Sequence, residues 1–189
     1  MTLDYKPELD ISAELDGQEA AYYQSLIGTL RWIVELGRVD IYTEASLMAS
    51  CMALPRMGHL DQLFRMFSCL KHHHNTEMVF DPSDPDIDES QFPADDWTHT
   101  LYYESKRPVP RNRPEERGFG FKIRAFVDSD HAGNDITRRS CTGFTVFLNS
   151  APIFWYSKKQ TSVQTSSFGS AFVALKECCE YLRGLTYKL

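Results

Sequence analysis

The stretch AFVDSDHAGN at residues 125–134 and the run TRRSCTGFTVFLNSAPIFWYSKKQTSVQTSSFGSAFVAL at residues 137–175 decide the expected fold. Apolar and polar residues alternate over Lys122–Val127, Gly143–Leu148 is rich in Thr, Val and Phe, and Ile153–Tyr156 is apolar and aromatic. These are strand patterns, and the connections between them are short and rich in Gly, Asn, Asp and Pro. Strands joined so closely predict an antiparallel meander.

A helix is expected directly after this meander. Thr165, Ser166 and Ser167 are residue types that favour the N-cap position, so the helix should run from about Phe168 to Leu185. Its buried face is expected to carry Phe172, Leu175, Cys179 and Leu182. The predicted order of this unit is therefore β-β-β-α.

The first part of the chain has helical periodicity instead. Residues 1–20 are polar and acidic and are expected to be a frayed lead-in. A first amphipathic helix should begin near Tyr22 and end at Gly37, a residue type favoured after helices. A second helix, capped by Asp40 or Thr43, should extend to Met52, and a third should run from about His59 to His72. Three short helices with short connections predict a small bundle.

Residues 76–120 differ from both parts, because an acidic Pro-rich stretch is followed by a basic Pro-rich one. We interpret this segment as a linker with short strands at Met78–Phe80 and Thr100–Tyr103. The expected organisation is a lead-in (1–20), a helical unit (21–75), the linker (76–120) and the sheet unit (121–189). The fold class is then α+β, a small helical bundle followed by a β-β-β-α unit.

Composition limits the function classes. The 189 residues carry a formal charge of −6 and are 42% hydrophobic. No stretch approaches the ~20 apolar residues of a membrane helix, the first residues lack a signal-peptide pattern, and no cysteine pair has CxxC spacing. We therefore expect no membrane association and a cytoplasmic or nuclear location with reduced thiols.

Charge is unevenly distributed along the chain. Residues 1–104 have 6 Lys and Arg against 19 Asp and Glu, which gives −13, whereas residues 105–189 have 14 against 7, which gives +7. A basic second half suits a polyanionic partner. Solvation of a mixed surface is the alternative.

Asp128 and Asp130 end the first expected strand, next to Gly133. A carboxylate at a strand end beside a turn is exposed and rigidly held, and Mg²⁺ prefers a few carboxylates together with waters. Asp128 and Asp130 are therefore candidate Mg²⁺ ligands. The alternative is that both acids serve as cap or turn residues.

Other polar residues have weaker functional interpretations. Arg138, Arg139, Lys158 and Lys159 flank the expected strands, with aromatic residues nearby, and are candidate contacts to a nucleic-acid backbone. The alternative is a solvated face with Trp155 in the core. The run His72–His74 cannot chelate one metal from a helix, because consecutive side chains point in different directions, and it suits a helix C-terminus better.

The order of motifs resembles a known family. V-D-x-D-x-A-G, T-R-R-S-x-T-G and W-x-S-K-K-Q, followed by a serine-rich start of a helix, occur within residues 127–170. This order and spacing resemble the ribonuclease H domain of copia-type retrotransposon polyproteins. YYQSLIGTLRWIVELGRVDIYTEASLMAS at residues 22–50, continuing through LKHHHN at 70–75, resembles the thumb and connection region of the reverse transcriptase in the same polyproteins.

The resemblance implies a ribonuclease H fold that hydrolyses the RNA strand of RNA:DNA hybrids with two Mg²⁺ ions. Asp128 matches the first metal-binding aspartate and Asp130 the second acid of that motif. The position of the family's catalytic glutamate is Ala171, and the remaining acids would lie beyond Leu189. A methyl group cannot bind a metal, so we expect weak or absent Mg²⁺ binding and little catalysis.

The polymerase motif Tyr-x-Asp-Asp is also absent from the sequence. The expected partners are an RNA:DNA hybrid or another nucleic acid and the remainder of the polyprotein. Two alternatives to a weakened enzyme fragment stay open at this point. One is a non-catalytic module that binds nucleic acid or a protein, and the other is an element remnant without a selected function.

Overall fold

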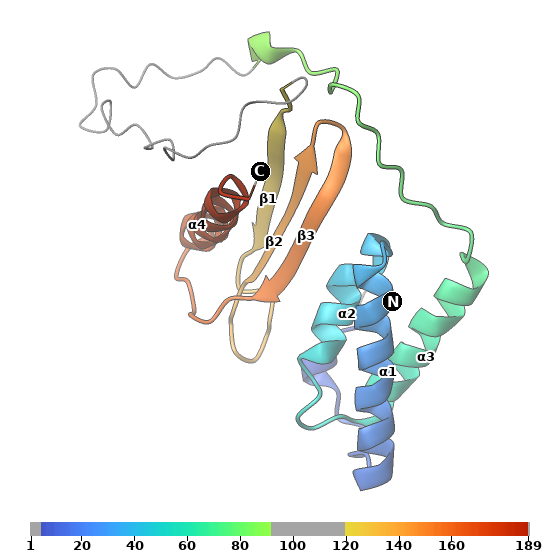
Figure 1. Ribbon diagram of the computed structural model, residues 1–189. Helices are drawn as coiled ribbons and strands as arrows, with labels where there is room; N and C mark the ends of the chain where they lie inside the picture. Colours follow the sequence, from blue (N-terminus) through green and yellow to red (C-terminus); the bar gives the residue numbers. More distant parts are fainter. Residues whose placement is uncertain (1–4, 92–119, 189) are drawn as a thin grey trace.

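The structure is a computed structural model that describes residues 5–91 and 120–188. Three helices come first and a three-stranded antiparallel sheet with a final helix comes last, so the expected α+β class is confirmed (Figure 1). The helices are α1 (Gly17–Glu35), α2 (Tyr42–Ala49), α3 (Met57–His72) and α4 (Ser167–Leu185), and the strands are β1 (Ile123–Asp130), β2 (Cys141–Leu148) and β3 (Ala151–Lys159). Three short 3₁₀ helices are η1 (Pro7–Leu9), η2 (Val39–Ile41) and η3 (Glu89–Gln91).

The helical unit has its own hydrophobic core. One face of α1 is fully buried against α2 and α3, and the Tyr23 hydroxyl donates a 2.7 Å hydrogen bond to the carbonyl oxygen of Met48. At the start of α1 the Asp16 side chain accepts hydrogen bonds from the amides of Gln18 and Glu19, which satisfies donors that a helix N-terminus leaves unpaired. The core residues are Tyr23, Ile27, Leu30, Val34, Ile41, Ala45, Met48, Leu60, Leu63 and Met66.

The lead-in is structured over residues 5–16, which corrects the prediction of a frayed segment. His59 Nε2 lies 2.8 Å from the carbonyl oxygen of Pro7, and the Tyr5 hydroxyl donates a 2.6 Å hydrogen bond to Asp10. Arg56 donates to the carbonyl oxygen of Ser12 at 2.6 Å. Long-range bonds from α3 hold this segment, and local periodicity cannot reveal such bonds.

Two further local predictions are wrong. α2 begins at Tyr42 without a side-chain cap, because the Asp40 carboxylate pairs with Arg38 at 2.7 Å, and the helix ends at Ala49, before Met52. Met78–Phe80 forms no strand, since no described strand lies beside it to supply a hydrogen-bonded ladder. The predicted strand at Thr100–Tyr103 lies outside the described residues.

The sheet is the meander that the sequence predicts, with strand order β1-β2-β3. β1 and β2 pair in continuous register from Ile123 opposite Leu148 to Asp130 opposite Cys141. β2 and β3 pair in the same way, with one irregularity between Val146 and Phe147. Since β2 is central, β1 and β3 are the two edges of the sheet.

α4 covers one face of the sheet, and of the four residues predicted for its buried face Leu182 packs against the core while Phe172, Leu175 and Cys179 are exposed. Its buried residues are Ser170, Ala174 and Cys178, whereas Phe172 is 59% exposed and Leu175 is 48% exposed. The fully buried residues of α4 are small, because a helix can approach a sheet closely only where its side chains are small. The predicted N-cap is confirmed at Ser166, whose hydroxyl accepts a hydrogen bond from the amide of Gly169.

The helical unit packs beside β3. Trp155 is half-buried against the core of the helical unit, and the Ser46 hydroxyl donates a 2.8 Å hydrogen bond to the carbonyl oxygen of Ser157. Residues of the linker bind the turn between β2 and β3, where Ser150 donates to the carbonyl oxygen of Ser83 at 3.2 Å. The chain therefore brings α2 to the same end of the sheet as the predicted site (Figure 1), and the hydrogen bond from the amide of Asp135 to Glu8 places the 3₁₀ helix η1 there as well.

Candidate nucleic-acid interface

The predicted site residues gather at the end of the sheet where β1 and β3 finish. Along β1, alternate side chains Ile123, Ala125 and Val127 pack in the core beneath α4. Side chains alternate between the faces of a strand, so Asp128 and Asp130 lie on the opposite face, away from α4. Both aspartates are exposed.

Each carboxylate already has a partner in the main chain. Asp128 Oδ1 accepts a 2.8 Å hydrogen bond from the amide of Ser129, and Asp130 Oδ1 accepts one from the amide of Cys141. Gly133 lies directly against the other oxygen of Asp130, and a Cβ added at this glycine would overlap that oxygen. The absence of a side chain at Gly133 therefore allows the turn after β1 to fold back onto the Asp130 carboxylate.

This donor set does not fit the two Mg²⁺ ions that the family resemblance implies. Asp128 and Asp130 stand two residues apart on a strand, about 6.6 Å along it. Among the described residues, no group of three or more His, Cys, Asp and Glu side chains converges on one point. Ala171 is an exposed residue of α4, on the other side of the sheet from the face that carries Asp128.

The loop between β1 and β2 is rigidly built. Asn134 Oδ1 accepts from both the amide and the hydroxyl of Thr137, at 2.7 Å each. The amide of Arg138 donates to the carbonyl oxygen of Asn134 at 2.8 Å, and the buried Ser140 hydroxyl accepts from the amide of Ala132. Ala132 and Arg138 adopt positive φ angles of 53° and 54° within this turn. The loop therefore holds its two arginines at fixed backbone positions.

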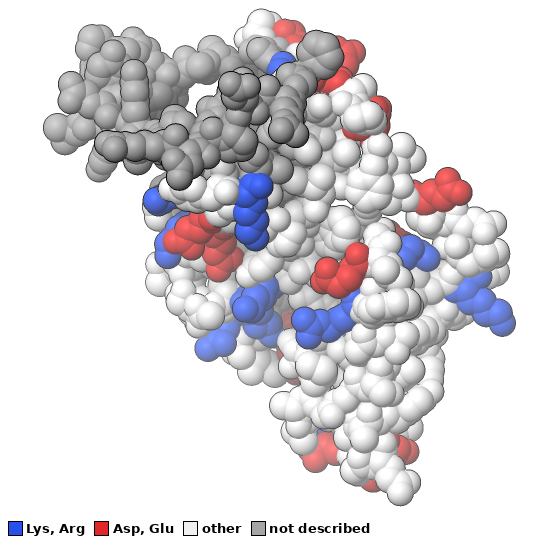
Figure 2. Space-filling model, in the orientation of Figure 1, with Lys and Arg blue, Asp and Glu red and all other residues white. Residues whose placement is uncertain are grey.

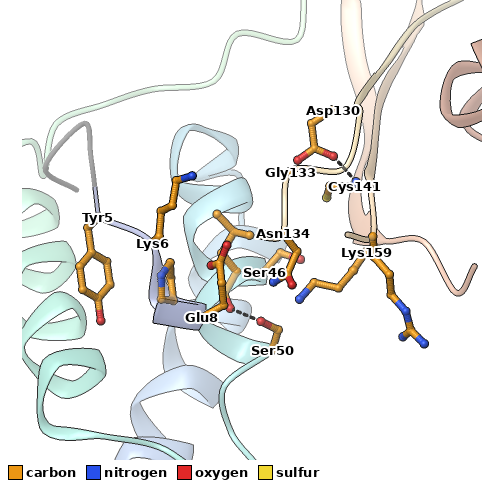
Figure 3. A pocket seen from close by; sticks show the side chains of 13 residues that line it. Tyr5, Lys6, Glu8, Ser46, Ser50, Asp130, Gly133, Asn134, Cys141 and Lys159 are labelled. Atoms are coloured by element: carbon orange, nitrogen blue, oxygen red, sulfur yellow. Dashed lines mark hydrogen bonds between the residues drawn. The ribbon is translucent and has the colours of Figure 1, made fainter. Parts of the chain in front are cut away.

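A cavity of about 190 Å³ lies between this end of the sheet and the helical unit (Figure 3). The sheet side contributes Asp130, Arg139 and Lys159, and Lys159 extends into the space beside Asn134. The opposite wall comes from residues that the sequence did not identify as functional. They are Tyr5, Lys6, Pro7, Glu8, Ser46, Leu47 and Ser50.

The N-terminal wall is tied to the β1–β2 loop by charge. Lys6 forms an ion pair with Asp135, and the amide of Asp135 donates a 3.0 Å hydrogen bond to Glu8. Because these partners are 129 and 127 residues apart in sequence, no local motif predicts their contact. Lys6 and Asp135 neutralise one another, so the remaining charged groups of the cavity are the cations Arg139 and Lys159 and the carboxylates Glu8 and Asp130.

Two of the four predicted basic residues line this cavity and two do not. Arg139 and Lys159 line it, and no described carboxylate lies within ion-pair distance of either. Arg138 lies 3.8 Å from Asp135, and Lys158 precedes Lys159 on β3, so its side chain lies on the α4 face. Figure 2 shows Lys and Arg side chains gathered over this end of the sheet and beside α2, with acidic groups between them.

Thiol groups report on the surroundings of Lys159. Burial raises the pKa of both Cys51 and Cys141, while the charge of Lys159 opposes the rise in each case. Cys51 follows α2 and Cys141 begins β2, so the ammonium group lies near both the helical unit and the sheet.

Comparison with known proteins gives distant relatives. The chain is 28% identical over 153 residues to the uncharacterized mitochondrial protein AtMg00810 of Arabidopsis thaliana, covering 81% of this chain and 49% of that protein. It is 36% identical over 67 residues to the secreted RxLR effector protein 161 of Plasmopara viticola, covering 35% of this chain and 47% of that protein.

The chain thus spans about half the length of the curated relatives it matches. No family model and no solved structure matches it. Within residues 5–91 and 120–188, no helix is both long and apolar enough to cross a membrane. The chain is therefore a homologue, over four-fifths of its length, of an uncharacterized plant mitochondrial protein.

Proposed function

We propose that this chain derives from the reverse transcriptase–ribonuclease H region of a copia-type retrotransposon and binds nucleic acid without efficient cleavage. The ligand is an RNA:DNA hybrid, held by its phosphate backbone at the end of the sheet. The single observation that carries the proposal is the pair Arg139 and Lys159. Both cations line one cavity without a carboxylate partner among the described residues.

Phosphate recognition suits the chemistry of this cavity. A guanidinium and an ammonium group attract phosphate, and the hydroxyls of Ser46 and Ser50 add polar groups to the opposite wall. Trp155 packs against the helical unit, so it is not available to stack on bases. Binding therefore depends on charge more than on base sequence, and it should weaken steeply with salt.

Cleavage is not part of the proposal, because the carboxylates present do not form a two-metal site. Asp128 and Asp130 each accept a main-chain hydrogen bond, and Ala171 supplies no ligand atom. No hydrolytic step is therefore derived through Mg²⁺. The family resemblance supports the proposed ancestry, and the two cations Arg139 and Lys159, which share their cavity with the carboxylates of Glu8 and Asp130, support the proposed binding.

Fluorescence anisotropy with a labelled 20-base-pair RNA:DNA hybrid tests the binding proposal. Lys159→Ala and Arg139→Ala are each expected to weaken binding and to lower the slope of log K against log salt by about 1, as for the loss of one phosphate contact. Lys71→Ala removes one exposed cation from α3 and is the matched control. Equal effects of all three substitutions, or no binding at 50 mM salt, would overturn the proposal.

A parallel cleavage assay tests the second half of the proposal. The same hybrid is incubated with Mg²⁺ or Mn²⁺ and with the unaltered chain, Ala171→Glu or Asp128→Asn. We expect no cleavage by any of the three. Cleavage by the unaltered chain that is lost in Asp128→Asn would show a functional metal site and contradict the non-catalytic assignment.

A further inference from the structure

β1 is an edge strand with an unusual arrangement of charges. On the face away from α4, Lys122 directly precedes the strand and is followed in order by Arg124, Phe126, Asp128 and Asp130 of β1. Two cations come first, an aromatic ring stands in the centre, and two anions come last. Such an order is complementary to that of a second, antiparallel copy of the strand, because each cation then lies opposite an anion.

Among residues 5–91 and 120–188, no strand is hydrogen-bonded to the outer edge of β1. The amide of Asn149 donates to the carbonyl oxygen of Lys122 at 2.8 Å, so residue 122 points its peptide groups toward β2. Peptide groups alternate in direction along a strand, so those of Ile123, Ala125, Val127 and Ser129 point outward. The outward amide of Ser129 donates only to the Asp128 side chain, and no described strand pairs with this edge.

We propose that β1 pairs with β1 of a second copy of this chain, antiparallel, about a two-fold axis through Phe126. In this register Ile123 and Ser129 exchange main-chain hydrogen bonds across the axis, as do Ala125 and Val127. The pairing therefore uses only the outward peptide groups. It continues each three-stranded sheet into a six-stranded one, which removes two exposed edges.

The side chains select this register over its neighbours. Arg124 of each copy lies opposite Asp128 of the other, and Lys122 lies opposite Asp130, which gives four favourable charge pairs. Phe126 meets its own equivalent at the axis, in a pair where the two side chains stand closest. Phe126 is 61% exposed in the single chain and packs edge-on against Phe147, with ring centres 5.7 Å apart.

A shift of the register loses these matches. If one strand moves by two residues, Asp128 comes opposite Phe126 and only one kind of charge pair is left. A parallel arrangement would place like charges side by side along the whole strand. Both alternatives are less favourable, because like charges opposite one another destabilise a strand pair.

The test is the association of the full chain, measured by sedimentation velocity from 5 to 200 µM. We expect a dimer that forms with concentration and weakens with salt. Asp128→Arg and Arg124→Asp should each weaken self-association at least tenfold, because two attractive pairs become repulsive. Lys71→Glu, a charge reversal on α3, should leave it unchanged.

Mixing the two variants makes the test independent of folding defects. Asp128→Arg and Arg124→Asp are complementary to each other in the proposed register. An equimolar mixture should therefore form a heterodimer, whereas each variant alone should associate weakly. A chain that stays monomeric to 200 µM, or a mixture that does not associate, would overturn the proposal. Association lost in Phe172→Ser but kept in both charge variants would assign it to the exposed face of α4 and would also overturn it.

Discussion

The hydroxyl of Ser46 on α2 donates a 2.8 Å hydrogen bond to the carbonyl oxygen of Ser157 on β3, 111 residues away in sequence. This bond lies between the core of the helical unit and the sheet. Because Ser157 is buried, its carbonyl group has little access to water in place of this donor. The Ser46–Ser157 bond therefore helps to fix the two walls of the cavity relative to each other.

Ser46→Ala should lower the free energy of unfolding by about 0.5 to 1.5 kcal/mol, the usual contribution of one hydrogen bond. It should also increase amide exchange at the end of β3. Urea denaturation combined with hydrogen–deuterium exchange measures both effects. Ser68→Ala, at an exposed position of α3, is the control, and an equal effect at both serines would contradict the assignment.

Gln160 connects three elements and should be more important for stability. Its side-chain amide donates to Thr142 Oγ1 at 3.1 Å and to the carbonyl oxygen of Ser170 at 3.0 Å, and the residue is only 2% exposed. Gln160→Ala removes the side-chain donor from Thr142 and Ser170 and leaves a space in a buried site, so we expect a loss of about 1 to 3 kcal/mol. Gln18→Ala, at an exposed site, should change the urea midpoint little.

The N-terminal segment should be sensitive to acid through Asp10. Burial opposes ionisation of this carboxylate, but hydrogen bonds from Ser12 and Tyr5 outweigh burial and hold its pKa below the usual 3.8. Its stabilisation is therefore complete above the unfolded-state pKa and is lost as the pH falls through the lower folded-state pKa. Stability measured from pH 6 down to pH 3 should decrease less steeply in Asp10→Asn than in the unaltered chain.

The five thiols should react in two groups. Cys69 and Cys179 are exposed, while burial raises the pKa of Cys51, Cys141 and Cys178. Since the thiolate is the reactive form, iodoacetamide at pH 8 should label the two exposed thiols first. Peptide mass spectrometry gives the rates, and in denaturant all five should react alike. Fast labelling of Cys178 in the native chain would contradict the packing of α4.

The orientation of α4 can be tested by paired substitutions. Phe172→Ser should change stability by no more than about 0.5 kcal/mol, because the ring is exposed. Ala174→Leu should cost about 1 to 3 kcal/mol, because Ala174 is fully buried against the sheet and a larger side chain overpacks it. If Phe172→Ser lowered stability more than Ala174→Leu, the buried face of α4 would be the one predicted from hydrophobicity.

Local sequence signals predicted the strands well and the helix face poorly. The meander, the cap at Ser166 and the glycine at position 37, with φ of 118°, follow from short-range chemistry. The face of α4 was predicted from its large apolar residues, and this holds for Leu182, whereas over the first half of the helix the buried residues are the small Ser170 and Ala174. Hydrophobicity alone does not report how closely two elements approach.

The candidate site was only half predictable for a related reason. Asp130, Arg139 and Lys159 come from motifs within 30 residues of one another. Their opposite wall, including Glu8 and Ser46, is brought there by packing between distant parts of the chain. Short motifs carry no information about such partners, so the cavity itself could not be inferred.

The attachment of the lead-in to the β1–β2 loop has a consequence for synthesis of the chain. Glu8 receives its hydrogen bond from Asp135, 127 residues later, so the N-terminal wall of the cavity lacks this bond until the sheet has emerged from the ribosome. Contacts of such long separation are formed late and slow the folding of a domain. A nascent chain that has exposed only residues 1–91 should therefore hold residues 5–9 through their contacts to α3, and should gain the Lys6 and Glu8 contacts only after the β1–β2 loop has been made.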